Sequence, residues 1–348
     1  MTSSTTPGIE VEAVTDWLRE HVDGAKPPFG FSLVAAGGSN LTYRVVDASG
    51  RAVALRRPPV TAVLATAHDM DREWLIIDAL HRKTTVPVPA PLAQCTDPEV
   101  SGAPFYVMDF VDGLILRTPA ESAGFTSDDY EAATDSLVDV QVNLHELDVD
   151  AVGLGDLARN RTSYVARQLR RWKTQVDTAR ARDLPVIDEV HDELVASVPP
   201  EQGEPGLVHG DYRFDNTVLG PDRRVIAVLD WELATIGDPV ADFAWSLLYW
   251  SDPGDEVRFI DDTPTLDPGF PRSDEVVERY AARSGRDLSA LGWYRAFGYW
   301  KMGCIVEGAY ARRLQGASGG MGARDPEEIA ARAARLFEHA RATVSAAS

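Results

Sequence analysis

The chain has 348 residues, of which 44% are hydrophobic and 25% are charged, values that exclude collagen-like, fibrous and disordered proteins. Its length is compatible with two domains or with one domain of two lobes. Asp and Glu outnumber Lys and Arg by 54 to 34, which gives a net charge of −20. Because nucleic acids and anionic membranes are bound by clustered basic residues, we expect neither as a partner.

The two cysteines, Cys95 and Cys304, cannot form a C-x-x-C pair or the ligand set of a structural zinc site, so we expect free thiols. The start of the chain lacks the basic and apolar regions of a secretory signal, and no run of about 18 apolar residues occurs. These features predict a cytoplasmic location. The sequence leaves the oligomeric state open.

The first 113 residues alternate short β-rich runs with helical patterns. In chain order we expect a helix over 11–22, a β-hairpin around the turn at 47–50, a helix over 69–81, an extended linker over 87–91 and a strand over 104–111. A glycine-rich turn precedes the hairpin, and three prolines in five residues predict the linker. Asp112-Gly113 is the expected boundary between two lobes.

Beyond Gly113 the sequence is dominated by long helical patterns. The expected helices cover residues 130–147, 164–182, 187–198 and 291–314. Embedded among them are two short strands, 217–219 and 225–229, joined by Gly220-Pro221-Asp222. The pattern predicts an α+β protein with a small β-rich N-terminal part and a larger, mostly helical C-terminal part.

The densest group of polar residues is His209-Gly210-Asp211, followed by Asn216 and, after the apolar run V-I-A-V-L, by Asp230. Phosphoryl transfer from a nucleotide needs a carboxylate that accepts the proton of the attacking hydroxyl, and oxygen ligands that hold Mg²⁺ against the phosphates. Three acceptor side chains at the ends of a short hairpin can supply this chemistry. The alternative is that Asp211 caps a turn and Asp230 ends a strand.

This segment resembles the catalytic segment of the aminoglycoside phosphotransferase family, a branch of the protein-kinase-like fold. The shared pattern is H-G-D-x-x-x-x-N, then a strand and L-D-W-E. The resemblance implies a two-lobed kinase-like fold, with a nucleotide-binding lobe over 1–110 and a catalytic and acceptor-binding lobe over 111–348. It also implies Asp211 as the catalytic base, Asn216 and Asp230 as Mg²⁺ ligands, and ATP or GTP as the phosphate donor.

The strand V-A-L-R resembles the V-A-x-K strand of kinases, with Arg56 in the place of the usual lysine. The chain has four lysines and none lies in this strand, so Arg56 would contact the phosphates, while Arg57 points to the opposite face. Glu73 on the following helix would pair with Arg56, the alternative being an exposed helical glutamate. The exchange of lysine for arginine also permits a pseudokinase that only binds partners, although the intact base and metal ligands oppose it.

Two further segments resemble the nucleotide-contacting parts of the family. G-G-S-N would be the turn that covers the phosphates, with contacts from Gly38, Ser39 and Asn40. P-F-Y-V-M-D-F-V resembles the hinge between the lobes, where the purine would contact Met108, Asp109 and Val111.

Other polar residues around the motif have structural interpretations. We expect His209 to be structural, and Gly237-Asp238-Pro239 and Asp242 to be loop and helix-cap features. Glu232, two residues after the predicted metal ligand, either helps to organise metal and water or is structural.

The motifs L-R-R-P-P, D-R-E-W, H-G-D-Y-R-F-D-N and L-D-W-E-L-A-T-I-G-D-P resemble a narrower branch, the kinase-like domains fused to acyl-CoA dehydrogenases. Fused members phosphorylate hydroxyacyl-CoA thioesters, so the resemblance implies a hydroxyacyl-CoA or another small alcohol as the acceptor. No flavin-binding or G-x-G-x-x-G signature supports a dehydrogenase.

An aminoglycoside or other antibiotic kinase is the alternative within enzymes. A cationic drug needs an acidic acceptor pocket, for which Glu307 and the pair Asp255-Glu256 are candidates, although such residues more often lie at the solvated surface. The aromatic helix over 291–314 either lines a pocket for an acyl or ring-bearing substrate or packs in the core.

Overall fold

The computed structural model describes residues 6–36, 40–60, 67–316 and 325–347. The chain divides into two compact units. Unit 1 comprises Met1–Gly113, Ala151–Leu154 and Ile226–Glu232, and unit 2 comprises Leu114–Asp150, Gly155–Val225 and Leu233–Ser348. Within the described ranges, no helix is both long enough and apolar enough to cross a membrane.

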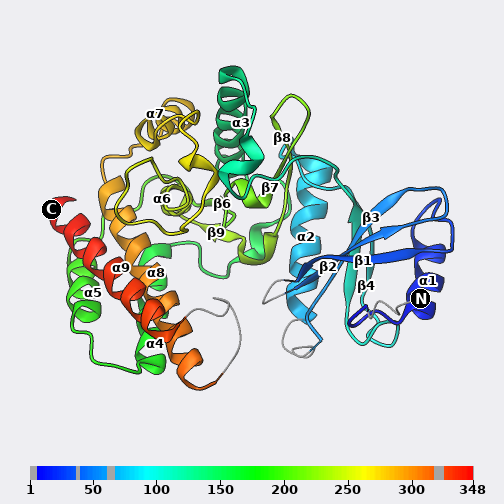
Figure 1. Cartoon of the computed structure of the whole chain (residues 1–348), viewed down its shortest axis with the longest axis horizontal. Coiled ribbons are helices and arrows are strands. Elements are labelled where there is room, and N and C mark those ends of the chain that lie inside the picture. The colour runs from blue at the N-terminus through cyan, green and yellow to red at the C-terminus, as the bar shows by residue number, and fades with distance from the viewer. Residues whose placement is uncertain (1–5, 37–39, 61–66, 317–324, 348) are drawn as a thin grey trace. The chain divides into compact units, whose positions relative to one another are not determined.

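Unit 1 contains a five-stranded antiparallel sheet of order β1-β2-β3-β5-β4 (Figure 1). Its strands are β1 (Gly30–Ala36), β2 (Leu41–Val46), β3 (Ala52–Arg57), β4 (Pro91–Cys95) and β5 (Phe105–Asp109), and its helices are α1 (Val11–His21) and α2 (Ala67–Lys83). Alternate residues of β2 are buried, as the period of two in a strand requires, and they join one hydrophobic cluster with Val14 and Leu18 of α1.

The structure confirms the predicted elements at α1, α2, β2, β3 and β5 and adds two strands, β1 and β4. β1 precedes the predicted glycine-rich turn, whose residues 37–39 lie outside the described part of the chain. The expected linker is wrong at its end, because residues 91–95 form β4. Proline is tolerated at Pro91 since it is the first residue of an edge strand, where its missing N–H removes no bond from the centre of the sheet.

Unit 2 is mostly helical (Figure 1). Its helices are α3 (Ser127–His145), α4 (Tyr164–Ala179), α5 (Val186–Ala196), α6 (Pro239–Leu247), α7 (Ser273–Ser284), α8 (Leu291–Leu314) and α9 (Pro326–Ala347). β6 (Gly206–Val208) pairs antiparallel with β9 (Thr235–Gly237), while β7 (Thr217–Leu219) precedes β8 (Val225–Val228), within which the chain passes into unit 1. Together the sheet and the helices confirm the predicted α+β class.

The predictions in this half are confirmed for α3, α4, α5, α8, β7 and β8, whereas α6, α7 and α9 were not expected. The aromatic helix α8 packs against α4, α5, α6 and α9. All its rings except the partly buried Tyr310 are buried, and the indole N–H of Trp300 donates to the Ile187 carbonyl at 3.0 Å. Of the two interpretations of this helix, core packing is therefore correct for Trp293, Tyr294, Phe297 and Trp300.

Candidate active site

Arg56 lies at the centre of a polar cluster in unit 1. Its Nε donates to Glu73 Oε2 at 2.8 Å, and its Nη2 donates to Asp230 Oδ1 at 2.5 Å. The side chain is only 12% exposed. Arg57 points to the opposite face and is buried, with Nη1 donating to the Ser101 carbonyl at 2.9 Å. The strand thus sends one arginine to each face, as its alternation requires.

We call this group the arginine cluster. Its members are Asn40, Arg56, Glu73, Tyr106, Asp230 and Glu232. Burial lowers the pKa of Arg56, but Tyr106 and the three carboxylates outweigh this effect and hold its pKa above the usual value. The guanidinium therefore stays charged in the folded protein.

Glu73 is the buried partner in the arginine cluster, and its carboxylate is 1% exposed. Besides the bond from Arg56, Oε2 accepts the Tyr106 hydroxyl at 2.8 Å and Oε1 accepts Nδ2 of Asn40 at 3.0 Å. Burial raises the pKa of Glu73, whereas Arg56 and the Tyr106 hydroxyl favour its ionised form. The alternative of an exposed helical glutamate is excluded, and the predicted pairing of Glu73 with Arg56 is present.

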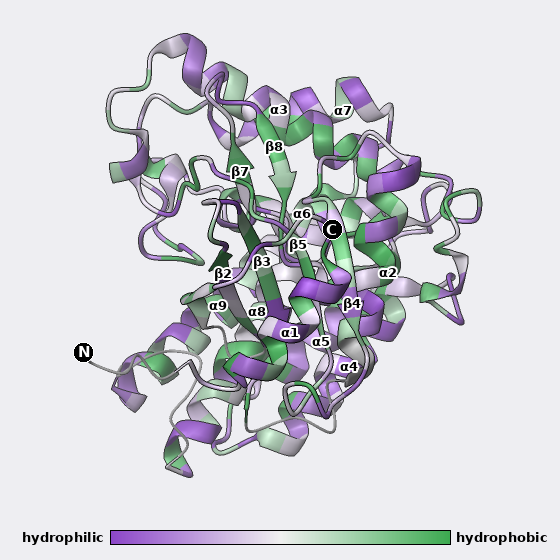
Figure 2. Ribbon diagram, turned by 90° about the vertical axis from the view of Figure 1, so that its right-hand side faces the viewer, coloured by the Kyte–Doolittle hydropathy of each residue, from purple (hydrophilic) through white to green (hydrophobic). Residues whose placement is uncertain are grey.

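Asp230 follows β8, which is hydrophobic along its length (Figure 2). Its backbone φ of 64° lies in the left-handed region, which Asp tolerates better than most residues. Glu232 accepts Nδ2 of Asn40 at 3.0 Å and lies 3.6 Å from Nη2 of Arg56. Glu232 is thus tied into the arginine cluster, an arrangement that sequence reasoning left undecided between metal organisation and structure.

The end of β5 carries the residues of the predicted hinge. Met108 is paired with Ala54 of β3, and both side chains are buried. The Asp109 amide donates to the Ala90 carbonyl at 2.9 Å, and Oδ1 of Asp109 lies 3.4 Å from Arg51. A purine here would have to use other backbone groups, such as those of Val111. Of the predicted phosphate turn only Asn40 can be placed, since Gly38 and Ser39 lie outside the described residues.

In unit 2, Asp211 and Asn216 are brought together within one loop. Nδ2 of Asn216 donates to the Asp211 carbonyl at 2.8 Å and to its Oδ2 at 2.9 Å. Because the amide nitrogen makes both bonds, the amide oxygen of Asn216 is left as the atom that could ligate a metal. Arg213 also lies near this carboxylate, with Nε 3.5 Å from Oδ2 of Asp211.

Asp242 holds the backbone of this loop in place. Its carboxylate accepts the amides of His209 at 3.1 Å and Gly210 at 2.8 Å, and it lies 3.0 Å from Nε2 of His145. Burial alone would raise the pKa of Asp242, but the bond and charge of His145 outweigh it, so that the pKa lies below the usual value. Because Asp242 accepts the amides of His209 and Gly210, it fixes the backbone directly before Asp211 and thereby the direction in which Asp211 points.

The cap prediction is therefore wrong for Asp242 and correct for Asp238. Asp238 is the N-cap of α6, and its carboxylate accepts the amides of Val240 and Ala241. Asp242 lies one turn further along the same helix and faces the loop instead. The sequence contains no local signal for this contact, because the partners are 32 and 33 residues away.

The glycine of the H-G-D motif has a geometric cause. Gly210 has φ of 83°, a conformation that L-residues rarely adopt. A Cβ atom at this position would lie 2.9 Å from Cβ of Leu233 and 3.0 Å from its carbonyl oxygen. The preceding His209 is fully buried and accepts the Asp211 amide at Nδ1, 3.2 Å away, which agrees with its predicted structural role.

A basic residue on β3 that pairs with a glutamate of the next helix, and an aspartate that bonds an asparagine five residues later, match the arrangement of kinase-like phosphotransferases, with arginine in place of lysine. A family model described as "Phosphotransferase enzyme family" matches residues 30–297. The chain belongs to this family and is a phosphotransferase.

The chain is also similar to individual proteins. It is 32% identical over 311 residues to human acyl-CoA dehydrogenase family member 11, a match that covers 86% of this chain and 39% of that protein. The chain thus spans about two fifths of the length of this relative. A Ralstonia eutropha structure named for the aminoglycoside phosphotransferases is 29% identical, with a TM-score of 0.80 and coverage of 96% and 98%.

A more distant structure supports the fold alone. The streptomycin-ATP-APH(2")-IIa ternary complex is 14% identical, with a TM-score of 0.62 and coverage of 95% of this chain and 96% of that one. These findings confirm the predicted family resemblance, including its link to the acyl-CoA dehydrogenase relatives, and the kinase-like fold.

Proposed function

We propose that the chain transfers the γ-phosphate of ATP, or alternatively of GTP, to a hydroxyl group of a small molecule in a Mg²⁺-dependent reaction. The observation that carries this proposal is the bonding of Asn216 to Asp211, which orients a carboxylate and frees an amide oxygen in one loop. The proposal retains residues 1–110 as the nucleotide-binding lobe and residues 111–348 as the catalytic and acceptor-binding lobe.

In the proposed reaction Asp211 accepts the proton of the acceptor hydroxyl. The hydroxyl oxygen forms a bond to the γ-phosphorus, while the bond from that phosphorus to the bridging oxygen breaks and its electrons leave with the nucleoside diphosphate. Nε of Arg213 lies 3.5 Å from Oδ2 of Asp211 and can hold this carboxylate in one orientation.

The residues present suit a hard divalent cation bound together with nucleotide phosphates. Asp230 bonds to Arg56 through Oδ1, and within the described residues its Oδ2 has no bonding partner. That oxygen and the amide oxygen of Asn216 are ligands of the type that Mg²⁺ prefers, and the bound ion would neutralise phosphate charge. Arg56 would contact the phosphates, with Asn40 beside it, and the end of β5 would contact the purine.

A hydroxyacyl-CoA thioester is the acceptor that we favour. The human relative carries acyl-CoA dehydrogenase in its name, and it matches this chain over 86% of its length. The candidates for an acidic drug pocket are neutralised: Glu307 is fully buried and lies 2.7 Å from Nη2 of Arg182. Asp255 and Glu256 line a cavity that also contains three arginines, Arg258, Arg332 and Arg335.

A cation in unit 2 further favours an anionic acceptor. Nζ of Lys301 lies 3.6 Å from the ring centroid of Trp245 and 5.7 Å from that of Trp172. In the described part of the chain it forms no salt bridge with a carboxylate. Burial lowers its pKa to about 8, and the charges of Asp242 and Asp211 oppose this shift, so the amine is mainly protonated at neutral pH. Such a group attracts a CoA ester and repels an aminoglycoside.

The first test is thermal unfolding with Mg²⁺ and either ATP or GTP. A ligand at about 100 times its Kd adds roughly 2.7 kcal/mol to the free energy of unfolding, which shifts Tm by a few degrees. We expect a Mg²⁺-dependent shift that Asp230→Asn removes. Absence of a shift with both nucleotides would contradict the proposal and favour a pseudokinase.

The second test is phosphate transfer to 3-hydroxyacyl-CoA and to streptomycin. We expect transfer to the thioester only, and Asp211→Asn should reduce turnover by about 10²- to 10⁴-fold while Tm is retained. Near-normal turnover of Asp211→Asn would exclude this residue as the base, and transfer to streptomycin alone would identify an antibiotic kinase.

A further inference from the structure

The contact between Arg56 and Asp230 lies wholly within unit 1. Nη2 of Arg56 donates to Oδ1 of Asp230 at 2.5 Å and lies 3.6 Å from Oε2 of Glu232. In the part of the chain that the structure describes, Oδ2 of Asp230 has no bonding partner. The two oxygens of this carboxylate are therefore not equivalent, because a cationic side chain occupies one of them and the other is open to a ligand.

Arg56 is also anchored independently of Asp230. Its Nε donates to Oε2 of Glu73 at 2.8 Å, and its Nη1 donates to the Thr42 hydroxyl at 3.4 Å. Glu73 is itself fixed, since its carboxylate is buried and accepts the Tyr106 hydroxyl at 2.8 Å. Because a guanidinium is planar and rigid, the bond from Nε also sets the direction in which Nη2 points. Nη2 is thus held at Oδ1 of Asp230 by the rest of the arginine cluster.

The number of oxygens that an aspartate offers discriminates between divalent cations. Mg²⁺ demands near-ideal octahedral geometry, into which the narrow angle between the two oxygens of one carboxylate does not fit, so it takes a single oxygen from each carboxylate beside waters and phosphates. Ca²⁺ is larger, takes about six to eight oxygen ligands and accepts both oxygens of one carboxylate. An aspartate with one open oxygen therefore meets the requirement of Mg²⁺ and restricts the binding of Ca²⁺.

We propose that Arg56 determines which metal ion the protein uses: it occupies Oδ1 of Asp230, leaves a single oxygen for the ion and so favours Mg²⁺ over Ca²⁺. The proposal rests on the proposed function, in which Asp230 is a metal ligand. It assigns Arg56 a role in metal specificity in addition to its contact with the phosphates. A lysine at this position would not have this role, because one ammonium cannot contact Glu73 and Asp230 as the guanidinium does.

Two conservative variants of the same strand separate this role from the general effect of an arginine. Arg56→Lys retains the charge, and its compact ammonium keeps the buried partner Glu73 while it releases Oδ1 of Asp230. Arg57→Lys is the matched control, because Arg57 also lies on β3 but points to the opposite face and donates to the Ser101 carbonyl.

The experiment measures the Kd of ATP from the shift in Tm, with Mg²⁺ or Ca²⁺ as the divalent cation and without an acceptor. The ratio of the two Kd values is compared between proteins, since a change in the contact with the phosphates affects both complexes and cancels in the ratio. We expect the wild type and Arg57→Lys to bind ATP at least about tenfold more weakly with Ca²⁺, and Arg56→Lys to reduce this ratio to about threefold or less.

The outcomes separate this proposal from the proposed function. Equal affinity of the wild type for ATP with the two ions would overturn the role of Arg56 and leave the proposed function intact, and this result needs no variant. An unchanged ratio in Arg56→Lys, or an equal fall of the ratio in Arg57→Lys, would also overturn it. A wild type that binds ATP with neither ion would contradict the proposed function and this proposal with it.

Discussion

The two units hold their functional groups by different means. In unit 1, Arg56 is held by carboxylates of opposite charge. The attraction between the guanidinium and the carboxylates offsets the energetic cost of burying these charges. In unit 2, the Asp211 loop is held through its backbone, by the two amides that Asp242 accepts and by the left-handed conformation of Gly210. The arginine cluster therefore depends on charge balance, whereas the Asp211 loop depends on backbone geometry.

The sharpest test of charge balance is Arg56→Ala. It leaves the 1% exposed carboxylate of Glu73 without its cation, and removal of one partner of a buried pair costs about 3–5 kcal/mol. We expect a loss of this size in the free energy of unfolding, measured by urea titration.

Arg56→Lys is the control, because it retains the charge. It should recover most of the stability but not the two-point contact with Glu73 and Asp230, which one ammonium cannot reproduce. Equal stability of the alanine and lysine variants would mean that charge balance does not stabilise the cluster.

Asp242→Asn tests whether the loop depends on its backbone bonds. The amide side chain has one acceptor oxygen, so it cannot accept both loop amides and the His145 ring at full strength. We expect a loss of about 1.5–3 kcal/mol in stability and of about 100-fold in turnover, since small displacements of a base are costly.

Asp238→Asn is the matched control on the same helix, because asparagine caps a helix about as well as aspartate. It retains both cap bonds and loses only the acceptor of the Tyr294 hydroxyl, so it should leave turnover unchanged. If Asp242→Asn lost stability and kept full turnover, the bonds from the His209 and Gly210 amides to Asp242 would stabilise the fold without positioning Asp211.

Gly210→Ala strains the same loop without removing a hydrogen bond. The left-handed conformation costs an alanine about 1–2 kcal/mol, and the added Cβ would meet Leu233. Because crowding adds to this cost, we expect a larger loss than this in the free energy of unfolding, together with lower turnover. Gly285→Ala, at φ of 63° with no atom within 4 Å of its added Cβ, should show the conformational cost alone. Identical losses in both variants would argue against crowding at Leu233.

An effect of a different kind, on the pH dependence of stability, is expected for Lys301, a charge outside both systems. Its pKa is about 8 in the folded protein and 10.5 when unperturbed, so the folded chain binds fewer protons than the unfolded one between these values. The free energy of unfolding of the wild type should therefore rise with pH across this interval relative to Lys301→Met. We expect the variant to be the more stable protein at pH 7 and its advantage in Tm to shrink toward pH 10. If the difference in free energy of unfolding between the wild type and Lys301→Met does not depend on pH, the contact with the Trp245 ring compensates the hydration that the Lys301 amine loses on burial.

The parts of the site that could be predicted from sequence are those defined by local spacing. The alternation of β3 separates Arg56 from Arg57, and the helix after β3 brings Glu73 to the same face, so their pairing followed from the motif. The H-G-D-x-x-x-x-N spacing brought Asn216 to Asp211 within one loop. The roles of these residues in catalysis and metal binding remain proposals.

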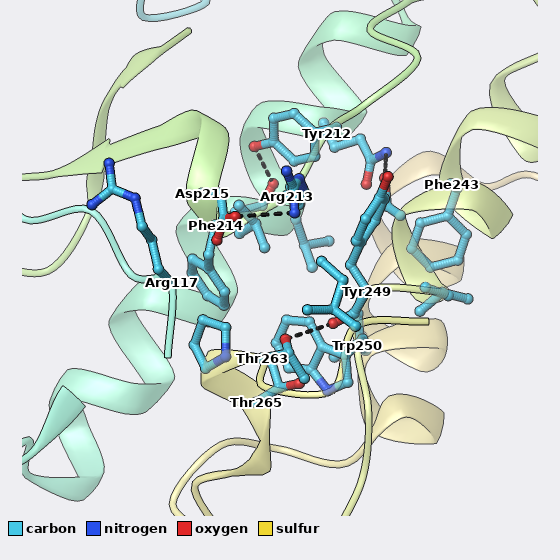
Figure 3. A pocket seen from close by; sticks show the side chains of 18 of the residues that line it. Arg117, Tyr212, Arg213, Phe214, Asp215, Phe243, Tyr249, Trp250, Thr263 and Thr265 are labelled. Carbon is cyan, nitrogen blue, oxygen red and sulfur yellow. Dashed lines mark hydrogen bonds and ion pairs between the residues drawn. The ribbon is translucent and has the colours of Figure 1, made fainter. Parts of the chain in front are cut away.

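The parts that could not be predicted depend on packing between distant segments. Asp242 resembled a helix-cap residue, and only the folded chain brings it to the Asp211 loop. A glutamate is typical of the protein surface, but Glu307 is buried. Its charge is paired with that of Arg182, which lies 125 positions earlier in the sequence. A pocket in unit 2 (Figure 3) is lined by residues that lie between positions 117 and 276, and no single segment of the sequence contains all of them.

The arginine on β3 has a consequence for chemical detection. Nucleotide analogues that acylate amines react with the strand lysine of ordinary kinases, whereas a guanidinium stays protonated and is a poor nucleophile. With only four lysines in the chain and none on β3, this protein would escape such reagents at the proposed nucleotide site. A survey that detects kinases through acylation of the strand lysine would therefore miss it, and detection at this site would need a reagent directed at another group.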